Sequence, residues 1–253
     1  MRRLLYFLFL FFPFASATAG LPDQMELEYS FNYGELPIGK VTKKLLRGKD
    51  GLYYHTTWTR ASGLARALTK AEWLEEGWFK LVGQDIQPQS FSETRKGDNK
   101  AYYRNAVFDW PKARLIFNNG QQSALPPGSQ DQGSFLYLFM LRSFANLGAQ
   151  SMPITDGETL NFYKFIYAGK EILETPFGKL EAAILQRLPS EPASEPSCRN
   201  INGQDPVNLR KCIDPADDFT VWLLPDKYNI AAKVRKRKNN QSFTLLLKSA
   251  GGF

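Results

Sequence analysis

The chain has 253 residues, of which 43% are hydrophobic and 14% aromatic, and its formal net charge is +7. This length supports one large β domain with a real core, or two small domains. The charge excess is too mild to indicate a nucleic-acid-binding protein, but it suits a surface near anionic lipids or acidic polysaccharide. With one histidine and two cysteines, the sequence predicts neither a metal site nor a cofactor site.

The first 19 residues have the layout of a secretory signal peptide. Two arginines precede an apolar run at residues 4–14, and small residues follow it. Cleavage after Ala17 or Ala19 fits this layout; we favour Ala19, and loss of the two arginines then lowers the formal charge from +7 to +5. The apolar run is shorter than the roughly 20 residues of a membrane span. We therefore predict a periplasmic protein with no permanent membrane span, in which residues 20–253 form a single domain.

Most of the remaining chain has the pattern of β-strands. Residues 25–33 alternate apolar and polar side chains, which is typical of a half-buried strand. Further runs rich in β-branched and aromatic residues follow, with hairpin turns predicted at Asn-Gly 119–120 and Asn-Asn 239–240. Residues 63–68 fit either a helical turn or a strand. About eleven strands at short spacing predict a mainly β protein, an antiparallel open or closed barrel.

The segment 125–148 is different, because it predicts one helix at about 130–147. Ser129 with Gln132 has the spacing of a capping box, and Asp131 lies in the first turn or is itself the N-cap. Apolar side chains surround the whole circumference, which is typical of a helix buried on several sides. A curved sheet wrapped around this helix would bury it. The helix then either fills the curve or covers a cavity, and its cavity side would carry Phe135, Phe139 and Met140.

A polar segment rich in Pro, Ser and Glu, residues 189–216, interrupts the strand pattern and indicates a loop insertion. It carries Cys198 and Cys212. In an oxidising compartment such a pair is expected to form a disulfide, worth about 3 kcal/mol on the loop-entropy account. A metal site at these cysteines would lack ligands, because His55 is far away in sequence.

Four segments occur in a recognisable order: YSFNYGELPIGK, LPPGSQDQGSFLYLFMLR, TPFGKLEA and VWLLPDKYNIAAKV. Together they resemble the exported bacterial family named domain of unknown function 3108, over roughly residues 26–247. The family's Gln-Asp and Trp–Pro–Asp positions correspond to Gln130, Asp131, Trp222, Pro225 and Asp226. The cysteine-bearing loop looks like an insertion relative to the family pattern. The resemblance implies no activity. A second likeness, in layout only, is to periplasmic lipoprotein carriers of the LolA and LolB type, which are open barrels with helices over an apolar cavity.

The sequence shows no clear catalytic constellation. His55 lies in an alternating strand, and we interpret it as a partly exposed strand residue rather than a base. The carboxylate pairs at 75–76 and 217–218 place their members on opposite strand faces, so we expect solvated turn charges. Distant carboxylates converging in the fold would still allow a hydrolase.

The densest basic run, residues 233–238, places three cations on one strand face: Lys233, Arg235 and Arg237. It fits a charged edge strand that prevents edge-to-edge aggregation, or a patch for anionic lipid or polysaccharide.

These observations together predict an exported, non-catalytic protein that binds an apolar or amphipathic envelope component between the sheet and the helix. One alternative is a scaffold or accessory protein of envelope or polysaccharide machinery, with the basic hairpin as its contact surface. The other is a hydrolase with dispersed carboxylates. The expected partners are a lipid or another apolar envelope ligand, or an envelope protein, and no nucleic acid.

Overall fold

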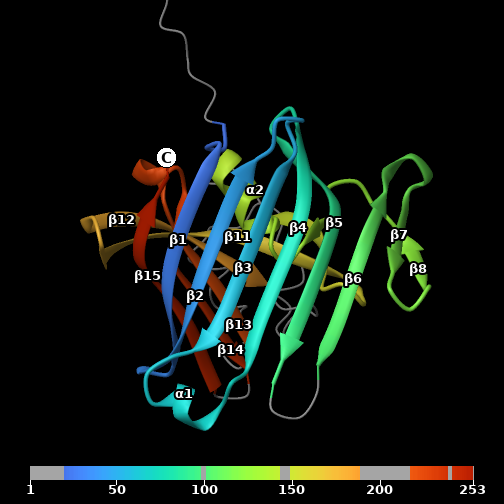
Figure 1. Ribbon diagram of the computed structural model, residues 1–253. Coiled ribbons are helices and arrows are strands. Elements are labelled where there is room, and N and C mark those ends of the chain that lie inside the picture. Colours follow the sequence, from blue (N-terminus) through green and yellow to red (C-terminus); the bar gives the residue numbers. More distant parts are fainter. Residues whose placement is uncertain (1–19, 98–100, 143–148, 189–216, 239–240, 253) are drawn as a thin grey trace, which may run out of the picture.

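The computed structural model describes residues 20–97, 101–142, 149–188, 217–238 and 241–252 (Figure 1). The expected signal peptide, the loop at 189–216 and the expected disulfide between Cys198 and Cys212 lie outside these residues. The same holds for the hairpin turn at 239–240.

The described chain forms one sheet of fifteen strands. The first eight are β1 (Gln24–Tyr33), β2 (Leu36–Arg47), β3 (Tyr53–Ala61), β4 (Glu72–Val82), β5 (Asp85–Lys96), β6 (Tyr102–Asp109), β7 (Arg114–Phe117) and β8 (Gln122–Ala124). The others are β9 (Gln130–Asp131), β10 (Gln150–Thr155), β11 (Leu160–Thr175), β12 (Gly178–Leu188), β13 (Asp217–Leu224), β14 (Ile230–Lys238) and β15 (Gln241–Gly251). The helices are α1 (Ala65–Leu68), α2 (Phe135–Leu141) and the 3-10 turns η1 (Trp110–Lys112) and η4 (Pro225–Lys227).

Strand order follows the chain from β8 back to β1 and then continues from β15 to β9. Every pairing is antiparallel except that of β9 with β10. The edge strands β8 and β9 do not pair with each other, so the strongly curved sheet is not closed into a barrel. The mainly β prediction with a barrel-like sheet is thus confirmed in its open form.

The expected count of about eleven strands is too low, and a short exposed helix, α1, accompanies the expected buried helix α2. The short strands β8 to β10 have only two to six residues, too few for alternation to predict them. Strand β11 continues through Gly169 as one strand, with a register shift between Tyr167 and Lys170. A bulge of this kind lets a strand absorb an irregular residue without ending.

The two faces of the sheet differ as the alternation predicts. On β1, the side chains of Met25, Leu27 and Tyr29 are buried on the concave face. The intervening Glu26 and Glu28 lie on the convex face and form ion pairs with lysines of β2. The hydrophobic core is therefore the space enclosed by the curve.

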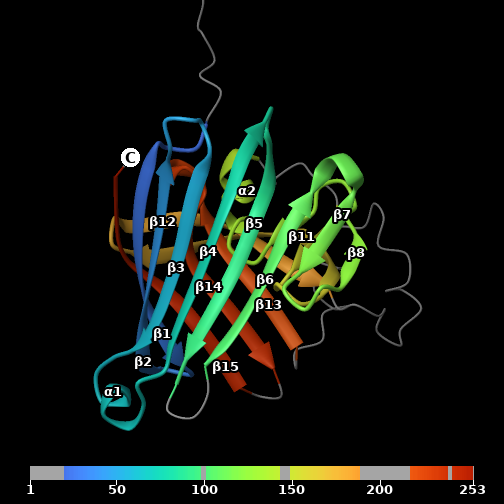
Figure 2. The same ribbon diagram turned by 45° about the vertical axis from the view of Figure 1, so that its right-hand side comes forward.

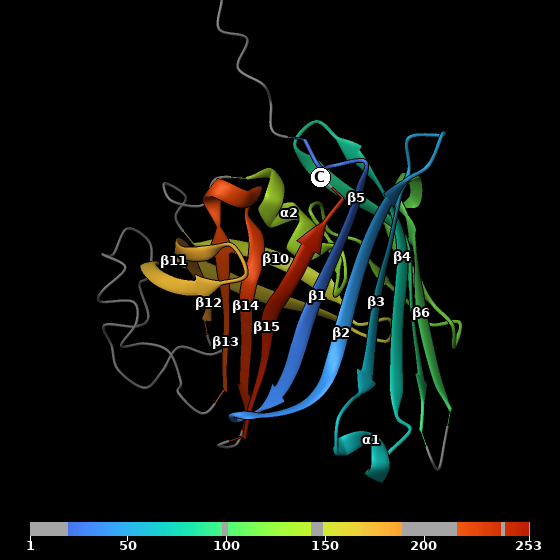
Figure 3. The ribbon, with the colours of Figure 1, turned by 60° about the vertical axis from the view of Figure 1, so that its left-hand side comes forward.

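Helix α2 lies between the two arms of the curved sheet (Figure 3). On one side, Tyr137 packs against Phe79 of β4, with ring centroids 5.9 Å apart. On the other side, Phe135 and Phe139 pack against Phe165 of β11, at 6.2 and 5.6 Å. Because both arms contact the helix, it needs apolar side chains around its whole circumference.

The helix begins later than expected, at Phe135 rather than near residue 130. Gln130 and Asp131 instead form the short strand β9, which pairs with β10. The expected capping box is also wrong, because the Ser129 hydroxyl donates to the Pro126 carbonyl, 2.7 Å away. Residues 143–147 of the expected helix lie outside the described residues.

The basic strand β14 is not an edge strand, which corrects that interpretation of residues 233–238. It pairs with β13 on one side and β15 on the other. Alternation alone cannot tell an edge strand from a central one, because both have the same period.

His55 is fully buried, so its expected partial exposure is also wrong. Its ring lies between Gly77 of β4 and Gly133, just before α2, and a Cβ at either glycine would overlap the ring. Because neither glycine has a side chain, β4 and the turn before α2 can both pack directly against the His55 ring.

We predict that Gly133→Ala lowers the free energy of unfolding by about 2 kcal/mol, because the added methyl overpacks a filled core. Urea unfolding of the purified chain measures the effect. Gly97→Ala is the control, since nothing lies within 4 Å of its Cβ position; equal stability of the two variants would contradict the packing argument.

Candidate ligand-binding cavity

A cavity of about 560 Å³ lies on the concave face of the sheet beside the first turn of α2. Seven aromatic side chains line it: Phe31, Trp73, Phe135, Tyr163, Phe165, Phe219 and Phe243. Aliphatic side chains and several ionisable groups complete it, the latter being Lys43, Glu75, Arg95, Asp156, Arg187 and Lys236. The lining is therefore amphipathic.

The mouth of the cavity lies at the end of the sheet away from α2. The lining residues Arg95, Lys236 and Gln241 are exposed, whereas Lys43 and Ile154 are buried. Helix α2 closes one end of the curve, and α1 projects from the opposite end (Figure 2). The cavity thus opens toward the end that carries α1.

A row of polar side chains crosses the inner wall. Lys43 of β2 is in register with Thr57 of β3, which is in register with Glu75 of β4. The Lys43 ammonium donates to the Thr57 hydroxyl at 2.8 Å. Adjacent in-register side chains on one face lie about 5 Å apart, so an ammonium, a hydroxyl and a carboxyl form one polar strip between the apolar core and the aromatic wall.

Burial shifts the ionisation of both charged ends of this row. It lowers the pKa of Lys43, and the nearby carboxylates Glu75 and Asp131 only partly offset that effect. It raises the pKa of Glu75, partly offset by Lys43. Both shifts disfavour the charged form of the group relative to a surface position.

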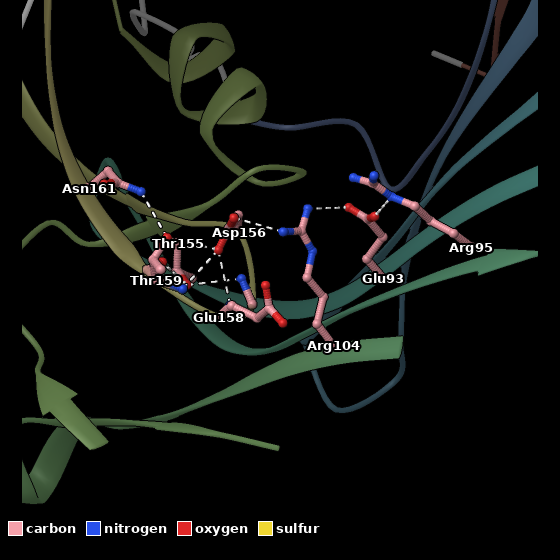
Figure 4. Close-up of polar contacts among 9 residues, drawn as sticks. Glu93, Arg95, Arg104, Thr155, Asp156, Glu158, Thr159 and Asn161 are labelled. Carbon is pink, nitrogen blue, oxygen red and sulfur yellow. Dashed lines mark hydrogen bonds and ion pairs between the residues drawn. The ribbon is translucent and has the colours of Figure 1, made fainter. Parts of the chain in front are cut away.

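An ion-pair network closes the gap between the two arms of the sheet (Figure 4). Glu93 of β5 and Arg104 of β6 are buried, and the guanidinium donates to the carboxylate at 2.7 Å. The same guanidinium donates to Asp156, in the β10–β11 turn, also at 2.7 Å. Arg95 contacts Glu93 from the mouth of the cavity. Arg104 therefore connects the N-terminal arm to the C-terminal arm where strand pairing is missing.

The β10–β11 turn holds Asp156 in place for this contact. One of its carboxylate oxygens accepts the amides of Glu158 and Thr159, at 3.0 and 2.8 Å. Burial alone would raise the pKa of Asp156, but these bonds and the Arg104 charge lower it below its usual range. The carboxylate is thus kept ionised opposite Arg104.

A second polar cluster lies directly before α2. The Asp131 carboxylate accepts the amides of Gly133 and Ser134, both at 2.8 Å, in the turn that leads into the helix. His55 Nε2 lies 3.5 Å from the same oxygen. The Gln130 amide donates to the Ile86 carbonyl at 2.8 Å, which ties β9 to β5.

Histidine, aspartate and serine meet in this cluster, but their geometry is structural. The Ser134 hydroxyl donates to Gln130, not to His55. His55, Asp131 and Ser134 are each 0% exposed, so no substrate reaches them. A triad needs a nucleophile bonded to its base, and this cluster instead fixes the start of α2.

The structure places the other predicted residues as follows. Phe135 lines the cavity, whereas Phe139 and Met140 belong to the packed core. The Trp222 indole donates to Glu171 at 3.0 Å on the convex face. Pro225 begins η4, and Asp226 is exposed in it.

The cations of β14 are engaged locally. Lys233 lies over the Trp222 ring, 4.4 Å from its centroid, and Arg235 pairs with the buried Asp218 at 2.6 Å. Asp218 is therefore not the solvated turn charge that was expected. Arg237 occupies the same strand face by alternation.

Sequence reasoning missed the polar row, although a signal for it existed. Tyr53, His55 and Thr57 alternate along β3 and are all buried. That parity assigns Thr57 to the concave face, but only strand pairing brings Lys43 and Glu75 beside it.

Comparisons with known proteins identify a family and a similar fold. The family described as "Protein of unknown function (DUF3108)" matches residues 28–248. No curated protein matches the chain. A solved structure from Brucella abortus, described as a β-barrel-like protein of domain of unknown function DUF1849, is similar with a TM-score of 0.56 and 9% identity, covering 90% of this chain and 97% of that one. At this identity the likeness concerns the fold alone. In the described residues, no helix is both long and apolar enough to cross a bilayer.

We predict that Arg104→Gln lowers the free energy of unfolding by about 3 kcal/mol, because the buried Glu93 loses the buried one of its two arginine partners and Asp156 loses its contact to the other arm. Arg47→Gln is the control, since its pair with Asp23 is exposed and such pairs contribute about 0–1 kcal/mol. Urea unfolding compares the two variants, and a loss no larger than that of the control would contradict the role of the network.

We also predict that the stabilising effect of Asp131 depends on pH. Burial would raise the pKa of Asp131, but His55 and the Ser134 bonds lower it below the ordinary 3.8. A depressed folded-state pKa gives stability that is present above pH 3.8 and lost as pH falls through the folded value. Asp131→Asn should therefore cost about 2 kcal/mol at neutral pH and progressively less below pH 3.8.

Unfolding curves measured at several pH values test this, with the exposed Asp226→Asn as the control. A difference between wild type and Asp131→Asn that stays constant from neutral pH into strong acid would refute the ionic contribution.

Proposed function

Because this chain belongs to the DUF3108 family of proteins of unknown function and encloses an amphipathic cavity, we propose that it binds an apolar or amphipathic molecule of the cell envelope. The binding is non-catalytic. The layout of residues 1–19 supports action in the periplasm.

The observation that carries this proposal is the cavity. Its volume of about 560 Å³ lies within the roughly 300–1,000 Å³ typical of small-molecule sites. Seven aromatic side chains face it, and aromatic walls suit an acyl chain or a ring system. A cavity that served only as core would be filled by its own side chains.

The polar row supports an amphipathic ligand rather than a purely apolar one. Lys43, Thr57 and Glu75 border the cavity on one side, and Arg95 and Lys236 lie at its mouth. A few polar groups in an apolar pocket fix the orientation of a ligand. The body of the ligand would lie against the aromatic wall, with its polar group at the row or at the mouth.

The two alternatives are less well supported. For a scaffold acting through the basic hairpin, Lys233 and Arg235 are already engaged by Trp222 and Asp218. For a hydrolase, Glu75 and Glu93 are in register on one face. However, Glu93 accepts from both Arg95 and Arg104, so it is not available as the second member of an acid–base pair.

The test is to fill the cavity from one strand. Thr59 lines the cavity on β3, whereas Thr56 lies on the opposite face of the same strand by alternation. We predict that Thr59→Trp weakens binding of a fluorescent amphiphile, an undecanoic acid carrying a dansyl group, about tenfold or more. Thr56→Trp should bind like the wild type.

Mass spectrometry of solvent extracts should likewise show a co-purified amphiphile in the wild type that is depleted in Thr59→Trp. The proposal fails if the wild type binds no probe and yields empty extracts, or if the two tryptophan variants bind equally well.

A further inference from the structure

The connection between β3 and β4 carries the most exposed apolar side chains in the described part of the chain. Leu64 is 88% exposed and Leu68 is 85% exposed. They are four residues apart across α1, a spacing that places both on one helical face. A soluble surface gains nothing from two adjacent exposed leucines, and such a feature marks an interaction site.

Basic residues lie in and beside the same connection. A hollow of about 460 Å³ at the base of the connection is lined by Lys40, Arg60, Arg66 and Lys70, with Glu72 as its one acidic group. Lys40 pairs with Glu28 on β1, and Arg60 lies 3.9 Å from the Trp58 ring centroid. Arg66 and Lys70 are exposed beside the leucines. Exposed apolar side chains with cations close by in the chain complement the two layers of an anionic lipid surface.

The connection lies at the same end of the sheet as the cavity mouth, but its hollow is on the convex face and the cavity on the concave face. Thr59 and Trp73 line the cavity, while their chain neighbours Arg60 and Glu72 line the hollow. Figure 1 shows α1 projecting beyond the sheet at the end opposite α2. Tyr33 and Leu36, 42% and 62% exposed at the β1–β2 turn, add apolar surface at the same end. A bilayer contacted by α1 would therefore face the cavity mouth.

We propose that the β3–β4 connection docks the protein reversibly on an anionic lipid surface. Leu64 and Leu68 enter the interface between headgroups and acyl chains, and the exposed Arg66 and Lys70 bind lipid phosphates. This attachment replaces the basic β14 hairpin as the lipid-facing surface. It is a surface property that does not depend on the cavity being occupied.

The experiment is co-sedimentation of the chain from Gly20 onward with vesicles. One set contains phosphatidylcholine alone, and the other contains about one third phosphatidylglycerol. The wild type should bind the anionic vesicles at least about tenfold more strongly, with binding weakened by added salt. Leu64→Ser with Leu68→Ser, and separately Arg66→Gln with Lys70→Gln, should each lower that binding about tenfold.

Two controls separate docking from folding and from cavity binding. Ile172→Ser with Lys179→Gln removes an exposed apolar and a basic side chain elsewhere, on β11 and β12, and should leave vesicle binding unchanged. Thr59→Trp should also bind vesicles normally, so failure of the cavity proposal leaves this one intact.

The proposal is overturned if the wild type does not prefer anionic vesicles, or if either α1 double variant binds like the wild type. It is equally overturned if the control double variant loses as much binding. Retention on an acidic polysaccharide without any vesicle binding would identify a different partner and also refute it.

Discussion

A curved sheet whose edges do not pair must close its concave side by some means other than strand hydrogen bonds, and the rest of this structure depends on that closure. Helix α2 provides it at one end, through aromatic contacts from Tyr137 to one arm and from Phe135 and Phe139 to the other. The Glu93–Arg104–Asp156 network provides it at the edge. Both closures are made by side chains and not by strand pairing. They therefore leave an interior that holds polar as well as apolar groups, unlike a barrel whose interior is filled with apolar side chains.

This mode of closure explains why the motif before α2 is polar yet fully buried. Asp131 orders the turn into the helix, Gln130 ties the turn to β5, and His55 fills the space left by two glycines. The backbone amides of the turn are satisfied by the Asp131 carboxylate, which offsets the cost of removing them from water. The Gln130–Asp131 pair thus fixes the start of α2, and the cavity is lined by other residues.

The cavity and α1 give the two ends of the molecule different properties. The α2 end is packed and ordered by the Asp131 turn. The other end carries the cavity mouth, exposed leucines and cations. The binding role proposed above fits this asymmetry, because the cavity has its opening at one end only of the curved sheet.

The sequence by itself determined the strand-rich class, the concave and convex faces and the presence of a helix apolar on all sides, since these follow from local periodicity. It also contained the family motifs that bracket the fold. Only the tertiary structure decided the number of strands, the central position of β14, the burial of His55 and the row of Lys43, Thr57 and Glu75. These depend on which strands become neighbours, and residues 14 to 32 positions apart meet only through register, which no local pattern encodes.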